Sequence, residues 1–308
     1  MSRTCACECS NPTYFAAMKF LISSTLTCIF SVVIIYSCSN PGNPISPADE
    51  KSGVKGKLFI IGGGDRDDSL NLAMIEASGV ESGGYIVVLP MASSVADSSY
   101  LWFLEDIRHV TQVPCFNFHL GEKDYVNTAR LDSLKKAKLI FICGGDQSRF
   151  MDLVRNTTIH DAIREAYKNG ATIAGTSAGA AMMSNVMITG DQTFSEEYEG
   201  TYRRLWKENA IYSEGLGLLD STVIDQHFVA RSRYNRLLTS LCDYPGMMGV
   251  GIDESTAIIV EGKKATVLGA SQVLVFHPVD SCRTNFHHLG LRDVHLDVLF
   301  SGQSFELK

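Results

Sequence analysis

The sequence lacks any block of lysine and arginine residues, and residues 57–308 contain no internal repeat and no low-complexity segment. With 27 basic and 34 acidic residues, the formal net charge is −7. This charge pattern predicts no basic patch that would bind a polyanion, and it argues against a nucleic-acid partner. The chain has 308 residues, of which 45% are hydrophobic, so it can bury a large core. This composition predicts a folded protein.

The N-terminal segment has the pattern of an export signal. Met18 and Lys19 supply a start and a positive charge, and residues 20–36 form a mostly apolar run. The run is near the lower length limit for crossing a bilayer, so a retained anchor helix is an alternative. It ends at Cys38 in a pattern like a bacterial lipobox, which predicts lipid acylation of Cys38.

These features predict the domain organisation. Residues 1–38 would be a signal and lipobox segment, with residues 1–17 preceding the true start. Residues 39–56 have the Pro-, Ser-, Gly- and Asn-rich composition of a tether, and residues 57–308 would form a single domain. We therefore expect an exported protein, either a lipoprotein anchored in the cell envelope or a secreted one. A lipid anchor would be its sole membrane contact.

Few cysteines fall within the predicted domain, and none suggests a metal site. The close spacing of Cys5, Cys7 and Cys9 is not followed by a second ligand pair, so it predicts no zinc site. The domain carries four cysteines in apolar surroundings: Cys115, Cys143, Cys242 and Cys282. We interpret these as small buried side chains that need no disulfide, even in an exported protein.

Apolar runs alternate with amphipathic stretches through the first half of the domain. Four runs read as buried strands, each closed by glycine or proline: residues 57–61, 85–89, 139–143 and 171–174. Amphipathic residues 69–78 and 159–169 predict helices between them. The alternation predicts an α/β fold with a mostly parallel sheet covered on both faces, and functional groups beyond the carboxyl ends of the strands.

The C-terminal region has a different pattern. Residues 257–260 and 265–268 flank a short polar turn and predict a hairpin, and residues 272–276 predict a further strand. We expect these strands to add an antiparallel edge to the mostly parallel sheet.

Residues 175–179 match G-x-S-x-G between a strand-like and a helix-like segment, the context of a nucleophile elbow. The pattern predicts Ser177 as a nucleophile; the alternative is a glycine turn whose serine caps a helix. An oxyanion hole requires two backbone donors. Ala178 supplies one, and Gly145, in a second glycine-rich turn, is suited to supply the other.

A serine nucleophile requires a general base, and His227 is the best placed of the eight histidines because it follows the short strand 222–224. An orienting carboxylate is expected from Asp253 or Glu254, which the pattern alone does not separate. Three arginines follow the histidine, and such a cluster suits carboxylate groups of a substrate: Arg231, Arg233 and Arg236.

Together, these motifs resemble the cyanophycinases over nearly the whole domain. That serine peptidase family also holds the aspartyl dipeptidases, and its three-layer αβα fold is similar to class I glutamine amidotransferases. The resemblance implies Ser177 as nucleophile, His227 as base and Glu254 as orienting acid. It implies substrate contacts for six residues: Gln147, Asp225, Gln226, Arg231, Arg233 and Arg236.

The resemblance also implies the reaction. The substrate would be cyanophycin, multi-L-arginyl-poly-L-aspartate, which is cut to β-Asp-Arg dipeptides through an acyl-enzyme, without a cofactor or metal. The alternative is a related serine peptidase acting on other aspartyl or isoaspartyl peptides. In either case the enzyme would act alone or as a homodimer. A lipoprotein that only binds is disfavoured because nucleophile, base and acid are all present.

Overall fold

The computed structural model describes residues 53–121, 124–195, 197–279 and 281–308, which lie in one unit spanning Glu50–Lys308. The predicted export segment, Cys38 and most of the tether lie outside the described residues. The first strand, β1, begins at Lys57. Within the described ranges, no helix is both long and apolar enough to span a bilayer.

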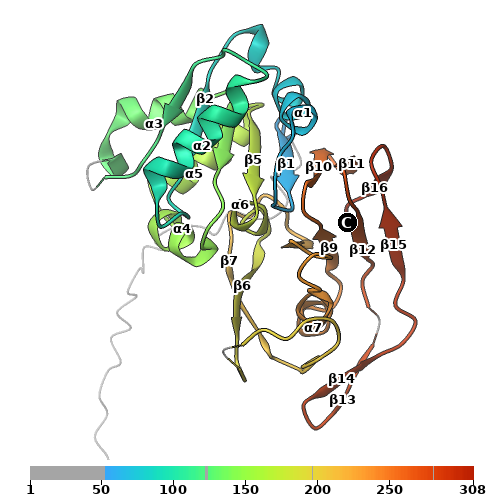
Figure 1. Ribbon diagram of the computed structural model, residues 1–308. Coiled ribbons are helices and arrows are strands. Elements are labelled where there is room, and N and C mark those ends of the chain that lie inside the picture. The colour runs from blue at the N-terminus through green and yellow to red at the C-terminus, as the bar shows by residue number, and fades with distance from the viewer. Residues whose placement is uncertain (1–52, 122–123, 196, 280) are drawn as a thin grey trace, which may run out of the picture. The chain divides into compact units, whose positions relative to one another are not determined.

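An eight-stranded sheet forms the centre of the fold (Figure 1). Its strand order is β16-β11-β10-β1-β5-β4-β2-β3, and the five strands from β1 to β3 in this order are parallel. These are β1 (Lys57–Ile61), β5 (Thr172–Thr176), β4 (Leu139–Ile142), β2 (Ile86–Leu89) and β3 (Cys115–Asn117). The antiparallel edge consists of β10 (Thr256–Glu261), β11 (Lys264–Gly269) and β16 (Ser304–Glu306).

Helices cover both faces of the parallel strands. Successive side chains along a strand point to opposite faces, so each strand contributes to two separate cores. Phe59 and Ile61 pack in the core with α1 (Asp68–Ser78) and α2 (Ala96–Arg108). Leu58 and Ile60 pack in a separate core with three helices on the other face: α3 (Thr128–Lys135), α4 (Gln147–Val154) and α5 (Thr158–Lys168). Short 3-10 turns are η2 (Val80–Ser82) and η3 (Asp124–Val126). The predicted three-layer αβα architecture is confirmed.

A second, four-stranded sheet was not expected from the sequence. Its order is β15-β12-β9-β8, comprising β8 (Thr222–Gln226), β9 (Met248–Ile252), β12 (Val273–Phe276) and β15 (Leu296–Leu299). The strand at 272–276 therefore does not extend the edge of the first sheet, and this part of the prediction is wrong. Val273 and Val275 share a core with Ile258 and Val267 of the first sheet, so burial of two apolar faces against each other explains the difference.

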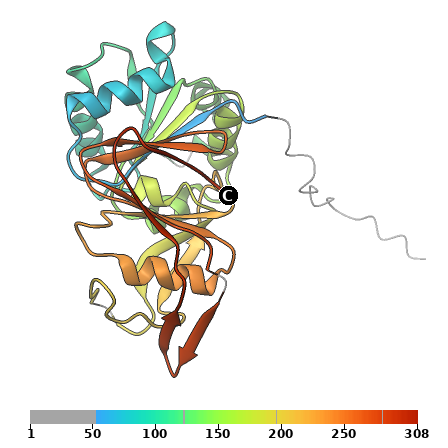
Figure 2. The ribbon, with the colours of Figure 1, turned by 90° about the vertical axis from the view of Figure 1, so that its right-hand side faces the viewer.

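A helix at 234–243 and the C-terminal hairpin at 282–291 lie on the side of the second sheet that faces away from the first sheet (Figure 2). Helix α7 (Tyr234–Asp243) packs Leu237 and Leu241 against Val223 and Phe276. Strands β6 (Val186–Gln192) and β7 (Ala210–Glu214) pair with each other, as do β13 (Cys282–Asn285) and β14 (His288–Leu291).

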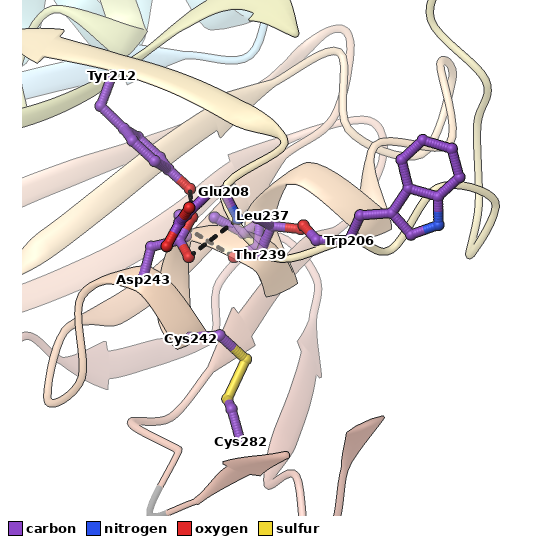
Figure 3. Close-up of a disulfide and its surroundings, with 9 residues drawn as sticks. Trp206, Glu208, Tyr212, Leu237, Thr239, Cys242, Asp243 and Cys282 are labelled. Atoms are coloured by element: carbon purple, nitrogen blue, oxygen red, sulfur yellow. Dashed lines mark hydrogen bonds between the residues drawn. A yellow bond between two sulfur atoms is a disulfide. The ribbon is translucent and has the colours of Figure 1, made fainter. Parts of the chain in front are cut away.

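Two of the four domain cysteines form a disulfide, Cys242–Cys282, which corrects the expectation that all four would be unbridged (Figure 3). The bond joins the last turn of α7 to the first residue of β13, 40 residues apart. The neighbouring Asp243 accepts hydrogen bonds from the Tyr212 hydroxyl at 2.8 Å and the Glu208 amide at 3.4 Å. Of the other two, Cys143 is buried and Cys115 half-buried, both as free thiols.

Candidate active site

Ser177 occupies a sharp turn between β5 and the short helix α6 (Ala178–Ala181). Its backbone has φ 54° and ψ −112°, a conformation that L-residues rarely adopt and that the surrounding structure must enforce. The amide of Ser177 donates a hydrogen bond to the Ile61 carbonyl at 3.0 Å, which ties the turn to the end of β1. The expected strand–turn–helix geometry is present.

Close packing explains why glycines flank the serine. A Cβ on Gly175 would lie 2.5 Å from the carbonyl oxygen of Gly179, and a Cβ on Gly179 would lie 2.5 Å from that of Ile142. Contacts of this length with backbone atoms cannot be relieved by a side-chain movement. The two glycines of G-x-S-x-G are therefore steric requirements of the turn.

A hydrogen-bonded chain links Ser177, His227 and Glu254. The Nε2 of His227 lies 2.9 Å from the Ser177 Oγ, and its Nδ1 lies 2.5 Å from the Glu254 Oε1. With its proton on Nδ1, the ring donates a hydrogen bond to the carboxylate, and Nε2 is free to accept the serine proton. The histidine side chain is 9% exposed and the glutamate 40% exposed, so the base is shielded while its partner reaches solvent.

The surroundings of His227 lower its pKa below the usual value. Burial is the largest cause, and the positive charges of Arg231 and Arg233 act in the same direction. The hydrogen bond from the ring to Glu254 opposes them. The imidazole is therefore neutral near pH 7, the state in which it can accept a proton.

The structure separates the two carboxylates that the sequence pattern alone left unresolved. Asp253 faces away from the histidine: its Oδ1 accepts from the amides of Val229 and Ala230 at 3.0 and 2.8 Å, and its Oδ2 accepts from the Ser271 hydroxyl at 2.7 Å. Asp253 thereby holds the loop that follows His227. Of this pair, it is Glu254 that contacts the imidazole.

The glycines after β1 belong to the site, although the sequence pattern indicated only a strand-closing turn there. A Cβ on Gly63 would lie 2.3 Å from the Cε1 of His227, and one on Gly64 would lie 2.7 Å from the Cβ of Glu254. The Gly62 carbonyl accepts from the His227 amide at 2.7 Å. Three consecutive glycines at the carboxyl end of a buried strand were the signal for this role.

The second glycine-rich turn lies beside the serine, as predicted. A Cβ on Gly144 would lie 3.3 Å from the Ser177 Cβ, and Gly145, at φ 140°, packs against the Ala92 carbonyl with no room for a side chain. The following Asp146 caps α4 through bonds from the Ser148 and Arg149 amides. The turns that carry Gly145 and Ala178 therefore flank the nucleophile.

Asp225 and Arg236 form a buried pair rather than a substrate-facing surface. Both side chains are buried, and the guanidinium donates two hydrogen bonds to the carboxylate, with Nε at 2.7 Å from Oδ2. This corrects the expectation that both contact substrate directly. An ion pair in the protein interior satisfies its own charges and leaves neither group free for a ligand.

Arg233 and Gln226 lie beside this pair. Arg233 donates to the Gln226 carbonyl at 2.9 Å, and its Nη1 lies 3.8 Å from the Asp225 carboxylate. Burial, followed by the charge of Arg236, lowers the pKa of Arg233 to about 10. Among the described residues, the buried Nε of Arg233 and Oε1 of Gln226 have no protein partner. Such unpaired atoms are unusual in a protein interior.

The other two expected substrate residues have different environments. Arg231 is exposed, one turn after His227, whose carbonyl accepts from the Arg231 amide at 2.9 Å. Gln147 is buried and its amide nitrogen donates to the Ile188 and Thr189 carbonyls, linking α4 to β6. Arg231 is thus available to a ligand, whereas the Gln147 amide nitrogen is engaged by the protein.

A serine on an elbow, hydrogen-bonded through histidine to a carboxylate at the edge of an α/β sheet, is the arrangement of a serine hydrolase. Comparison with known proteins specifies the class. Residues 58–268 match the model of peptidase family S51. The chain belongs to this family and is a serine-type peptidase.

Similar curated proteins include cyanophycinases and peptidases E. A cyanophycinase of Trichormus variabilis is 30% identical over 237 residues, covering 73% of this chain and 76% of the relative. One of Thermosynechococcus vestitus is 30% identical over 279 residues, covering 86% and 84%. A peptidase E of Actinobacillus pleuropneumoniae is 29% identical over 154 residues, covering 47% and 60%.

Solved structures support the fold. A peptidase from an acI-B1 actinobacterium superposes with a TM-score of 0.59 at 21% identity, and the match covers 82% of this chain and 97% of that one.

Proposed function

We propose that Ser177, His227 and Glu254 form a catalytic triad. The His227 Nε2 takes the proton of the Ser177 hydroxyl as Oγ attacks the scissile carbonyl, and the Glu254 carboxylate stabilises the resulting imidazolium. The oxyanion of the tetrahedral intermediate would accept hydrogen bonds from the Ala178 and Gly145 amides. The hydrogen-bonded chain through His227 carries this proposal.

The reaction then completes in two further steps. The imidazolium gives its proton to the leaving amine, which departs and leaves an ester on the Ser177 Oγ. A water molecule, deprotonated by His227, attacks the ester and regenerates the serine. One peptide bond is hydrolysed with no net change in the enzyme.

The proposed substrate is cyanophycin, and the proposed products are β-Asp-Arg dipeptides. Each unit of this polymer offers a carboxylate and a guanidinium. The exposed guanidinium of Arg231 suits a carboxylate of such a unit. Relatives that cover most of this chain are named cyanophycinases, which agrees with this assignment.

The alternative substrate is another aspartyl or isoaspartyl peptide. The similarity to a peptidase E favours it, although over a shorter part of the chain. Incubation with insoluble cyanophycin distinguishes the two: release of β-Asp-Arg, measured by mass spectrometry, supports the first substrate. Cleavage of small aspartyl peptides without any release from the polymer would establish the second.

The triad is tested separately from the substrate. We expect Ser177→Ala and His227→Ala each to lower turnover on whichever peptide is cleaved by about 10³-fold or more. Because triad members act as a unit, the double variant should be scarcely slower than either single one. A single variant with near wild-type turnover would remove that residue from the mechanism.

We also propose that the protein is exported and anchored through Cys38. The apolar run at 20–36 supports this, as does the Cys242–Cys282 disulfide, since such bonds persist in oxidising compartments. Mass spectrometry of the mature N-terminus provides the test. A diacylglycerol-modified Cys38 is expected; an unmodified N-terminus beginning at Met1 or Met18 would refute the anchor.

A further inference from the structure

Two histidines and an aspartate converge at the outer edge of the second sheet, away from the active site. They are His277, which follows β12, His295, which immediately precedes β15, and Asp297 on β15. Each residue offers one ligand atom, and these three atoms all lie within 4.8 Å of one another. Neither the proposed peptidase mechanism nor the substrate contacts use these residues.

The strand register brings the three side chains together. Phe276 pairs with Leu296 in the antiparallel ladder, so the next residue, His277, lies opposite His295, and its amide donates to the His295 carbonyl at 3.0 Å. Asp297 follows two residues later, and therefore projects from the same face of the strand as His295. The hydrogen bond between His277 and His295 continues the pairing of β12 with β15 by one residue, so backbone pairing positions the three residues relative to one another.

The side chains are arranged around a common point. The Nε2 of His277 lies 2.8 Å from the Asp297 Oδ2, and the Nε2 of His295 lies 3.5 Å from Oδ1, so each nitrogen faces one oxygen of the same carboxylate. The two imidazole rings stack with centroids 4.1 Å apart and planes 13° from parallel. Both rings therefore direct Nε2 toward the carboxylate.

We propose that His277, His295 and Asp297 bind a divalent transition-metal ion, with Zn²⁺ the best match. Zinc takes imidazole nitrogen at about 2.0–2.1 Å and carboxylate oxygen at about 2.0–2.2 Å, so tetrahedral ligand atoms lie roughly 3.3 Å from one another. The two nitrogen–oxygen separations of 2.8 and 3.5 Å span this value. Water would complete the coordination.

Accessibility and ligand chemistry favour the assignment. The His295 side chain is 69% exposed, His277 32% and Asp297 39%, so an ion can enter from solvent without unfolding. Two imidazoles and one carboxylate favour zinc and its neighbours over calcium or magnesium, which prefer oxygen ligands.

The site would act on stability rather than on catalysis. β12 contacts β9 with Phe276 opposite Gly249 and Val273 opposite Ile252, and Glu254 follows Ile252. The metal residues therefore lie beyond the end of β12 that is remote from the triad. An ion there would join the edge strand β15 to β12 and stabilise the folded state in proportion to its occupancy.

The test uses the full chain without an affinity tag, titrated calorimetrically with ZnCl₂. We expect a site that His277→Ala and His295→Ala each weaken at least about tenfold. His109→Ala is the matched control: its Nδ1 lies 3.2 Å from Asp68 in an exposed pair with one histidine, and zinc binding should be unchanged. All variants keep the N-terminal cysteines, so thiol binding contributes equally to each.

Thermal unfolding gives a second readout. At about 100 times the dissociation constant, ZnCl₂ should raise the Tm of the wild type by about 5 °C and leave that of Asp297→Asn nearly unchanged. A thermal unfolding transition of each variant in EDTA shows that the variant is folded in the absence of zinc. Equal zinc binding by the wild type and both histidine variants, or no binding by the wild type, would overturn the proposal.

Discussion

Gly63 lies against the imidazole of His227 so closely that a Cβ at this position would be 2.3 Å from the ring. The end of β1 thereby sets the position of the ring, and it also accepts the Ser177 amide through the Ile61 carbonyl. The glycine-rich turn after β1 thus supports two residues of the proposed triad that come from other parts of the chain.

We expect Gly63→Ala to lower kcat/KM by about 10²-fold, because a displacement of the base by about 1 Å disrupts its alignment with the nucleophile. Kinetics on the cleaved peptide provide the measurement. Gly262→Ala is the control, since Gly262 also has positive φ, at 62°, but a Cβ added there would meet no atom within 4 Å. Equal losses in both variants would show that backbone strain, rather than contact with His227, is responsible.

The pH profile should depend on Arg231. The proposed base must be neutral to accept a proton, so activity falls as the pH drops through its pKa. The positive charge of Arg231 helps to keep that pKa low. Arg231→Gln should therefore move the acid limb of kcat/KM to higher pH, whatever its effect on the maximum rate. Arg283→Gln, on the exposed β13 strand, removes the same charge at a distance and should leave the limb in place.

The buried pair of Asp225 and Arg236 should contribute strongly to stability. Arg236→Met leaves the carboxylate without its bidentate partner, and breaking such a pair costs about 3–5 kcal/mol of unfolding free energy. Urea denaturation measures the loss. The double change with Asp225→Leu should recover part of it, because the carboxylate no longer remains buried without its bidentate partner. A double variant as unstable as the single one would contradict this account.

Removing the disulfide should also destabilise the fold. The bond constrains a segment of 40 residues in the unfolded chain, so Cys242→Ala with Cys282→Ala should lose about 2–4 kcal/mol. Guanidinium denaturation under non-reducing conditions tests this. Cys115→Ala, which removes a half-buried free thiol, should change stability much less. If reductant lowers the stability of the wild type no more than that of the double variant, the disulfide does not form in solution.

The sequence predicted the parts of the site that depend on local pattern. The elbow at Ser177 and the position of His227 followed from glycines and histidine placed just after short apolar strands. The choice between Asp253 and Glu254 depended on which carboxylate points toward the imidazole, and neighbouring residues of one turn do not reveal that by pattern.

Other features depend on contacts between distant segments. The disulfide joins cysteines 40 residues apart, and their proximity follows from the packing of α7 beside the β13–β14 hairpin. The burial of Arg236 similarly arises because Asp225 lies under the first turns of α7. A cluster of arginines in the sequence looks the same whether its members face solvent, substrate or an internal carboxylate.

The proposed triad draws on both sheets: Ser177 follows β5 of the first, His227 follows β8 of the second, and Glu254 lies on the connection from β9 to β10. Neither sheet alone carries a nucleophile together with its base. Hydrolytic competence therefore arises only when the two sheets have packed together, which makes peptidase activity a direct reporter of the completed tertiary structure.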